Sequence, residues 1–382
     1  MNRDRFTALR DGWARLDGPA GSQIADPVIE AMADWMRSGS QANHGGVFKH
    51  AHETDELVES TRVACATLLG GDASGVVFGP SFTALTMRFA ATVVRSLEPG
   101  DEIVCTRLDH DSNVRPWVIA AERAGVTVRF AEPDEGTLEL PASAVQAVLS
   151  ERTKWVAVTA ASNAVGSVPD LEGIVAAAHG VGARVYVDAV HATPHRRNDL
   201  SALDADVIGC SAYKWFGPHV AMLCGKPEVM SAYRPDKLNP SPEESPDRWE
   251  LGTLPFESLA GVRAAAEYML ELDFEAVHAH EQALLRSALD GLGAMDHVTL
   301  YGAAADRAPT LMFTVAGHHP TEVARFLYEG EIAVWDGNYY AWELERVLGL
   351  APHGGIRAGF LHYNDASDAE RLLAAVAELK GV

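Results

Sequence analysis

RVYVDAVH at residues 184–191 and VIGCSAYKWFGP at residues 207–218 are the stretches that decide the fold. Each opens with a run of apolar, largely β-branched residues, which is typical of a buried strand. The first run ends in Asp188, and the second ends in Ser211 and is followed by Lys214. In open α/β sheets, ligands bind beyond the carboxyl ends of the strands. The two stretches therefore predict a sheet with an acid and a lysine at its ligand-binding edge.

Further short apolar runs accompany these two, and stretches of helical periodicity separate them. The predicted strands are residues 75–78, 102–106, 127–130, 155–159, 184–188, 207–211 and 221–225. The predicted helices between them include residues 82–96, 116–124, 141–149 and 171–179. Short apolar strands that alternate with amphipathic helices are typical of a mainly parallel sheet covered on both faces. The sequence therefore predicts an α/β fold on seven strands.

A polar segment at residues 234–248, rich in Pro, Ser and Glu, separates this region from a more helical C-terminal part. We expect it to be a surface loop. Beyond it, the predicted helices are residues 259–272, 275–292, 320–328 and 366–380, and residues 310–315 are a predicted strand. This mixture predicts a smaller α+β domain. We expect a large domain at 21–254, a small C-terminal domain at 255–382, and an N-terminal segment, residues 1–20, that joins the small domain.

The composition is that of an acidic globular protein. Of 382 residues, 31 are Lys or Arg and 53 are Asp or Glu, so the formal charge is −22. Nucleic-acid backbones and anionic membranes are bound by clustered Lys and Arg, so we expect neither as a partner. No run reaches the roughly 18 apolar residues of a membrane span. The four cysteines form no C-x-x-C pair, which predicts reduced thiols in a cytoplasmic protein, with no disulfide scaffold and no metal site.

Lys214 and Asp188 stand 26 residues apart on neighbouring predicted strand ends. This pair suits pyridoxal 5′-phosphate (PLP), because the lysine amine forms a Schiff base with the aldehyde and the carboxylate pairs with the protonated pyridine nitrogen. The start of a predicted helix at Ser81, Phe82 and Thr83 offers hydroxyls and backbone N–H groups to the phosphate. A histidine near the ring can stack on its face. The sequence therefore predicts PLP as the cofactor.

Each of these residues taken alone also has a structural explanation. Asp188 and Ser81 suit the first position of a helix, and Lys214 suits the surface. His110 and His191, taken singly, are typical of structural histidines. The set favours PLP because its members gather at one predicted edge of the sheet.

Longer strings of the sequence resemble a known family. They are LDGPAGSQ (16–23), TRLDHDSNVRPW (106–117), TAASNAVGSVPDL (159–171), VYVDAVH (185–191), CSAYKWFGP (210–218), WELGT (249–253) and GIRAGFLHYN (355–364). Together they resemble the fold-type I PLP enzymes, specifically the class V aminotransferase and cysteine desulfurase group. The resemblance runs over most of the chain and implies a PLP-dependent enzyme that acts on an amino acid.

The resemblance implies a role for each matching residue. Lys214, His110 and Asp188 are the implied catalytic residues: the lysine carries PLP, the histidine stacks on its ring and the aspartate pairs with its nitrogen. The other implied cofactor contacts are Asn163 and His191 near O3′, Ser81, Phe82, Thr83 and Ser211 at the phosphate, Tyr213 beside the lysine, and Thr253 reaching the phosphate from the neighbouring subunit. The implied substrate contacts are Arg357, which would take the α-carboxylate, together with Asn163, Tyr339 and Tyr340. For Arg357 the alternative is a surface ion pair.

The sequence departs from the family pattern at two places. Tyr213 stands where a histidine often precedes the Schiff-base lysine. Cysteine desulfurases also carry a nucleophilic cysteine upstream of the carboxylate-binding arginine, whereas no cysteine follows Cys224 in this chain. The corresponding stretch, residues 332–341, reads IAVWDGNYYA. The family's sulfur-accepting thiol is therefore absent from this stretch.

These departures favour carbon–sulfur β-elimination on cysteine or an S-substituted cysteine. Lys214 would be the base for the Cα proton, and the aromatic residues of segment 335–342 would line a pocket for a bulky S-substituent. The same aromatics also suit a domain or dimer contact. Transamination, a decarboxylating or desulfurase-like reaction and a non-catalytic PLP-binding protein are the alternatives. Because Thr253 would reach a phosphate only across an interface, we expect a homodimer.

Overall fold

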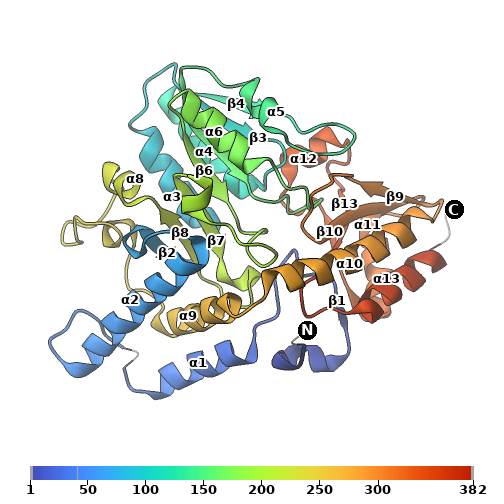
Figure 1. Cartoon of the computed structure of the whole chain (residues 1–382), viewed down its shortest axis with the longest axis horizontal. Helices are drawn as coiled ribbons and strands as arrows, with labels where there is room; N and C mark the ends of the chain where they lie inside the picture. Colours follow the sequence, from blue (N-terminus) through green and yellow to red (C-terminus); the bar gives the residue numbers. More distant parts are fainter. Residues whose placement is uncertain (1–2, 41, 380–382) are drawn as a thin grey trace.

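In the computed structural model, which describes residues 3–40 and 42–379, a central sheet runs through the larger part of the molecule (Figure 1). Its strands, in spatial order, are β2 (Val76–Gly79), β8 (Ala221–Gly225), β7 (Val207–Ser211), β6 (Arg184–Asp188), β5 (Thr153–Thr159), β3 (Glu102–Thr106) and β4 (Thr127–Ala131). Strand β8 is antiparallel to both neighbours, and the remaining pairs are parallel. The predicted mainly parallel, seven-stranded sheet is confirmed.

Helices cover both faces of this sheet because side chains of each strand alternate between two apolar clusters. In β5, Val156 belongs to one cluster and Trp155 to the other. The helices against the sheet are α2 (Lys49–Leu69) and α6 (Leu171–Gly180) on the first cluster, and α3 (Phe82–Val94) and α4 (Arg115–Ala124) on the second. The short helices α5 (Ala142–Gln146), α7 (Leu200–Leu203) and α8 (Pro227–Ala232) complete the layer. The sheet is therefore buried on both sides.

The predicted helix at residues 141–149 is longer than the observed α5. Its last turn tightens, because the N–H of Val148 bonds to the carbonyl of Val145 at 3.0 Å, an i→i−3 spacing. The segment at 234–248 holds neither α-helix nor strand, as expected of a loop, and a short 3₁₀ turn (Asp247–Trp249) ends it.

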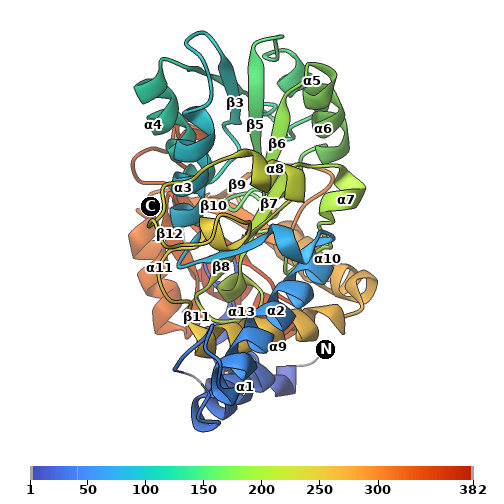
Figure 2. The same cartoon turned by 90° about the vertical axis from the view of Figure 1, so that its left-hand side faces the viewer.

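Two helices that the sequence analysis did not predict, α1 (Asp26–Arg37) and α2, pack against α9 (Phe256–Leu270). Figure 2 shows this layer below the sheet. The packing is close: a Cβ on Gly261 of α9 would lie 2.7 Å from the side chain of Met32 in α1. Helix α9 thus contacts elements of the predicted large domain, although the boundary at residue 254 assigns it to the small one. The domain boundaries stay predictions.

The C-terminal region holds a second, antiparallel sheet. Its strands, in spatial order, are β12 (Trp335–Gly337), β13 (Gly355–Gly359), β10 (Thr310–Val315) and β9 (Val298–Tyr301). The helices of this region are α10 (Phe274–Gly293), α11 (Pro320–Glu329), α12 (Trp342–Val347) and α13 (Ala366–Glu378). The predicted end of the last helix, Lys380, lies outside the described residues. None of the described helices has the length and apolar character needed to cross a bilayer.

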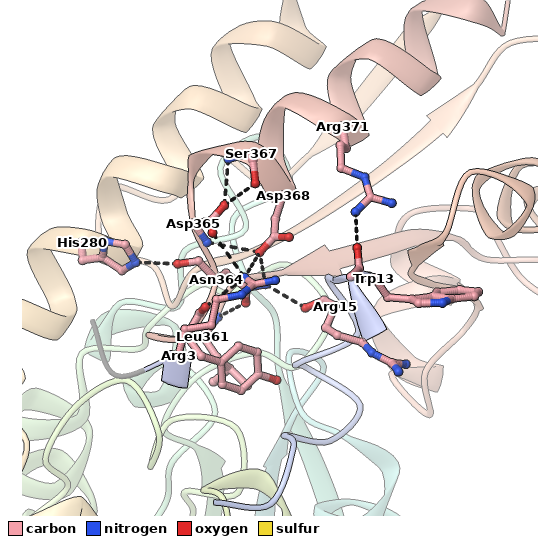
Figure 3. A network of polar contacts seen from close by, with 12 residues as sticks. Arg3, Trp13, Arg15, His280, Leu361, Asn364, Asp365, Ser367, Asp368 and Arg371 are labelled. Atoms are coloured by element: carbon pink, nitrogen blue, oxygen red, sulfur yellow. Dashed lines mark hydrogen bonds and ion pairs between the residues drawn. The ribbon is translucent and has the colours of Figure 1, made fainter. Parts of the chain in front are cut away.

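The N-terminal segment lies against these C-terminal elements (Figure 3). Strand β1 (Ala14–Arg15) pairs in parallel with β11 (Ile332–Ala333). The amide of Asn364 donates to the Arg15 carbonyl at 3.0 Å, and the Arg3 guanidinium donates to the carboxylate of Asp368 at 2.9 Å. From there the chain runs toward the carboxyl ends of the central strands, where residues 17–23 contact the turn after β7.

Candidate active site

One cleft at the carboxyl ends of the central strands collects nearly all the predicted cofactor contacts. Its lining includes Ser81, Phe82, Thr83, His110, Asn163, Asp188, His191, Ser211, Tyr213 and Lys214. A cavity of about 820 Å³ shares part of this lining and adds Arg357, Tyr339 and Tyr340. Residues from both ends of the sequence therefore meet at one site. Thr253 is exposed and does not line this cleft in the described chain.

Lys214 ends a single 3₁₀ turn, Ala212–Lys214, that follows β7 directly. The N-terminal segment braces this turn: the hydroxyl of Ser22 donates to the Tyr213 carbonyl at 3.0 Å and accepts the N–H of Phe216 at 2.7 Å. The Lys214 amine itself donates to the carbonyl of Pro19. Lys214 is therefore a buried residue held at the cleft, and the surface alternative is wrong.

Burial and, to a smaller extent, the positive charge of Arg357 lower the pKa of the Lys214 amine, Asp188 opposes both effects, and the resulting pKa is about 7. Asp188, at the end of β6, is 3% exposed and accepts the N–H of Val190 at 2.9 Å. Burial raises its pKa to about 7, while Val190 and the charge of Lys214 hold the pKa down. Each group thus shifts the pKa of the other, as a lysine and an acid flanking one ligand do.

Asp188 begins no helix, because a turn follows it and α7 starts only at Leu200. The helix-capping alternative is therefore wrong. A second buried acid, Asp109, lies nearby and accepts the side-chain amide of Asn113 at 2.7 Å. Burial raises the pKa of Asp109 to about 8, and the charge of Asp188 adds to that rise. The sequence analysis gave Asp109 no role, although it directly precedes His110.

The start of α3 forms the end of the cleft suited to an anion. Ser81 caps the helix, with its hydroxyl accepting the N–H of Ala84 at 3.1 Å. The capping alternative is thus correct, and it is compatible with a ligand because the earlier N–H groups of the first turn remain. A Cβ on Gly209 of β7 would lie 2.5 Å from the Phe82 ring, so the glycine lets α3 approach β7 beside Ser211. A helix N-terminus attracts phosphate.

His110 lies at the mouth of the cleft between a turn and an aromatic ring. Its Nδ1 accepts the N–H of Ser112 at 3.0 Å, and its ring centroid is 5.5 Å from that of Tyr340, with the planes tilted by 33°. Burial, followed by the charges of Lys214 and Arg357, lowers the pKa of His110 to about 3. The imidazole is therefore neutral at physiological pH and suited to stacking.

Arg357 comes from the middle of β13 and is 4% exposed. Its guanidinium donates to the carbonyl of Asn163 at 2.9 Å and lies 4.5 Å from the centroid of the Tyr339 ring. Burial lowers the pKa of Arg357 to about 10, so it stays protonated at neutral pH. The structure shows no ion pair for Arg357 with an acid among residues 3–40 and 42–379, so the surface ion-pair alternative is wrong. A buried cation with unused donors suits a substrate carboxylate.

The segment Tyr339–Tyr340 lines the cavity and contacts two cleft residues through its main chain. The Tyr339 carbonyl accepts the side-chain amide of Asn163 at 2.9 Å, and the Tyr340 carbonyl accepts the N–H of Asp111 at 2.7 Å. Both tyrosines have positive φ, 51° and 58°, a strained conformation for residues with a Cβ. The side-chain oxygen of Asn163 has no partner. Such an orphaned acceptor in a cleft is suited to a bound ligand.

The remaining predicted contacts lie around this centre. His191 is buried, and its Nε2 lies 2.9 Å from the hydroxyl of Thr310. The Tyr213 ring stacks on His219, with centroids 5.0 Å apart and planes 8° apart. The four cysteines are all buried, and burial raises the pKa of each thiol. Thiols in this state are poor nucleophiles.

Several lining residues were missed by the sequence analysis. They are Ala20, Met87, Asp111, Ser112, Arg115, Pro116, Thr159, Ala161, Val190, Asp336, Gly337, Asn338 and Pro352. Some, such as Ser112, lie in strings quoted for the family resemblance, which was the signal that could have found them. Others, such as Met87, come from helical positions that carry no motif.

The donor set fits PLP. An amine and an acid line one cleft together with a helix N-terminus and an unpaired amide oxygen. The family model described as aminotransferase class-V matches residues 14–372. The chain belongs to the class V aminotransferase family. It is a PLP-dependent enzyme of fold type I, and these expectations are confirmed.

Curated relatives cover nearly the whole chain. A "probable cysteine desulfurase 2" from Mycobacterium leprae is 32% identical over 95% of this chain and 90% of its own length. An uncharacterized protein from Mycobacterium tuberculosis is 33% identical over 99% of this chain and 98% of its own length. A solved cysteine desulfurase from Thermococcus onnurineus superposes with a TM-score of 0.92 at 26% identity, covering 99% of this chain and 96% of that one. The chain is thus similar to desulfurases throughout.

Proposed function

We propose that this class V enzyme is a carbon–sulfur β-lyase that acts on cysteine or an S-substituted cysteine. The observation that carries the proposal is the segment that lines the cavity, where Tyr339 and Tyr340 stand and no cysteine follows Cys224. The relatives named cysteine desulfurase support a cysteine-like substrate. β-Elimination needs no enzyme thiol, whereas persulfide formation does.

Two neighbouring residues, Arg357 and Asn163, orient the substrate in this proposal. Arg357 binds the α-carboxylate, and the orphaned oxygen of Asn163 accepts a hydrogen bond from the substrate or the cofactor. Asp188 is buried in the cleft and would hold the pyridine nitrogen of PLP and balance its positive charge. PLP, when bound, supplies an electron sink that stabilises negative charge at Cα.

Lys214 is the base that accepts the Cα proton when the Cα–H bond breaks. A pKa of about 7 leaves a large fraction of its amine neutral at physiological pH, so it can accept the Cα proton. The electron pair of the Cα–H bond forms a Cα=Cβ bond as the sulfur leaves Cβ with its own bonding pair and takes up a proton as a thiol, and water hydrolyses the released enamine to pyruvate and ammonia. Trp335 and Tyr340 line the cavity on the side where an S-substituent would lie.

The test is substrate profiling of the purified holo-protein. We expect cysteine or S-substituted cysteines to yield thiol (or sulfide), pyruvate and ammonia in equal amounts, and the Lys214→Ala variant to yield none. Alanine formed with transfer of sulfur would instead show desulfurase chemistry. A keto acid that keeps the substrate's side chain, formed with conversion of the cofactor to its amine form, would show transamination, and release of CO₂ would show decarboxylation. Any of these three results in place of pyruvate overturns the proposal.

A further inference from the structure

A buried ion pair outside the cleft joins α2 to the segment that follows the surface loop. Arg62 of α2 is 2% exposed. Its guanidinium donates to both carboxylate oxygens of Glu250, at 2.8 and 2.9 Å. The same guanidinium also donates to the carbonyl of Val76 at 2.6 Å. This parallel, two-bond geometry is the strongest form of a side-chain ion pair and fixes orientation as well as distance.

The pair closes the open edge of the central sheet. Strand β2 is the edge strand beside β8, so one side of its backbone has no strand partner. On that side, Glu250 accepts the N–H of Phe78 at 2.8 Å, while Arg62 takes the carbonyl of Val76. Phe78 lies three residues before Ser81, which caps α3. The ion pair therefore fixes the strand that delivers the phosphate end of the cleft.

Glu250 also lies three residues before Thr253. Its neighbour Trp249 is 2% exposed, and the indole N–H of Trp249 donates to the Met230 carbonyl at 3.0 Å. After Trp249 the chain reaches the protein surface, where Leu251 is 63% exposed and Thr253 is also exposed. Glu250 is thus the last buried point before the residue that we expect to enter the partner's site.

We propose that Arg62 and Glu250 are positioning residues that align two phosphate-binding elements at once. One element is the start of α3 in the same subunit, and the other is Thr253, which serves the site of the second subunit. The inference rests on the proposed roles of Ser81 and Thr253, and it is independent of which reaction the cofactor performs.

The experiment measures cofactor binding by the full-length apoprotein, followed as visible absorbance during titration with PLP. Glu250→Gln keeps the shape of the side chain but removes the buried carboxylate charge, which leaves Arg62 with the more exposed acids Asp247, at 3.2 Å, and Glu59, at 3.6 Å. We expect PLP to bind at least about tenfold more weakly, and the ³¹P resonance of the bound phosphate to move. Arg62→Lys keeps the charge and loses the two-bond geometry, so we expect a smaller loss of affinity in the same direction.

Glu102→Gln is the matched control. Glu102 is also a buried carboxylate in the central sheet, and it accepts hydrogen bonds from Arg129 and Arg152 at 2.8 Å each. It begins β3, at the end of the strands opposite the cleft. We expect this variant to lose stability and to keep wild-type affinity for PLP. Equal loss of PLP affinity in Glu102→Gln and Glu250→Gln would show a general stability effect and overturn the inference.

Thr253→Val separates the inference from the proposals on which it rests. Weak PLP binding by Thr253→Val together with wild-type binding by a folded Glu250→Gln overturns the positioning role alone. Wild-type PLP affinity in Thr253→Val shows that Thr253 does not hold the phosphate. This result overturns the proposal that Arg62 and Glu250 align two phosphate-binding elements. If Glu250→Gln does not fold, Arg62→Lys decides: unchanged affinity and an unchanged ³¹P resonance overturn the inference, and a loss supports it.

Discussion

The groups around the Lys214 amine shift its pKa in opposite directions. Burial and Arg357 favour the neutral amine, and Asp188 favours the charged one, with a resulting pKa of about 7. Because only a neutral amine attacks an aldehyde, attachment of PLP to the apoprotein should speed up as the pH rises through about 7 and level off above it. The rate of appearance of the visible absorbance band, measured across pH, checks this expectation.

The Arg357→Gln variant tests the direction in which Arg357 shifts the pKa of Lys214. Removing a positive charge beside Lys214 raises its pKa, so the midpoint of the attachment profile should move to higher pH. A midpoint that stays in place or moves down would show that the arginine does not act on the lysine electrostatically.

A second residue-scale prediction concerns substrate binding. Arg357→Lys keeps the charge but replaces a planar fork by a single ammonium, so it cannot pair with a carboxylate through two parallel bonds. We expect KM for the amino acid to rise at least about tenfold, with a smaller change in kcat. Steady-state kinetics test this, with PLP affinity as the internal control. An unchanged KM would remove Arg357 from the substrate site.

At the scale of elements, the Tyr339–Tyr340 segment lies in the stretch, residues 332–341, where the family resemblance leads us to expect a cysteine-bearing loop. Tyr340 is 71% exposed and has a φ of 58°, so its side chain adds strain with little burial. We expect Tyr340→Ala to raise KM for bulky S-substituted cysteines and to leave PLP affinity unchanged.

Tyr340→Gly is the matched partner of that variant. Both lose the ring, but glycine relaxes the positive φ. Gly should therefore be the more stable of the two by about 1 kcal/mol, because the relief of strain exceeds the extra chain entropy of glycine in the unfolded state. Thermal unfolding measures the difference, and equal KM values in the two variants would assign the kinetic effect to the ring. An alanine variant with wild-type KM would remove Tyr340 from the substrate pocket.

The amino end of the central sheet supports a prediction on acid stability. Hydrogen bonds from Arg129 outweigh burial and, with those from Ser150 and Arg152, lower the pKa of Glu102 to about 2, from an ordinary 4.5. A carboxyl whose pKa is depressed by folding stabilises the protein above its unfolded pKa, and this stabilisation is lost as the pH falls through its folded pKa. The stability advantage of wild type over Glu102→Gln should thus be constant near neutrality and shrink between about pH 4.5 and 2. Denaturant unfolding at several pH values tests this, and an advantage that grows toward acid would contradict it.

At the scale of the whole molecule, the predicted homodimer has a direct test by subunit complementation. A chain with Thr253→Val keeps Lys214, and a chain with Lys214→Ala keeps Thr253. In a mixed dimer, one of the two sites then holds both residues if Thr253 acts across the interface. We expect each homodimer to be weak or inactive and the mixed dimer to recover about half of the wild-type activity. No recovery, or a fully active Thr253→Val homodimer, would show that Thr253 plays no role in the partner's site.

Much of the fold and of the candidate site could be predicted from local sequence patterns. The apolar runs predicted each strand of the central sheet, because a strand buried on both faces has few alternatives to an unbroken apolar segment; only the edge strand β4, with exposed Thr127 and Arg129, departs from this pattern. The residues after those runs, Asp188 and Lys214 among them, predicted the cofactor site, because parallel strands deliver their carboxyl ends to one edge. Helices α1 and α2 were not predicted, since their packing partner, α9, is about 200 residues away in sequence.

By itself, the sequence determined the sheet, the lysine–acid pair and the lack of a cysteine after Cys224. These depend on residue type and on short-range periodicity. Only the tertiary structure decided that Arg357 is buried against Tyr339, that Pro19 and Ser22 brace the lysine turn, and that Arg62 holds Glu250 at the sheet edge. Those contacts join segments far apart in the chain, and burial and pKa shifts exist only once the segments have packed together.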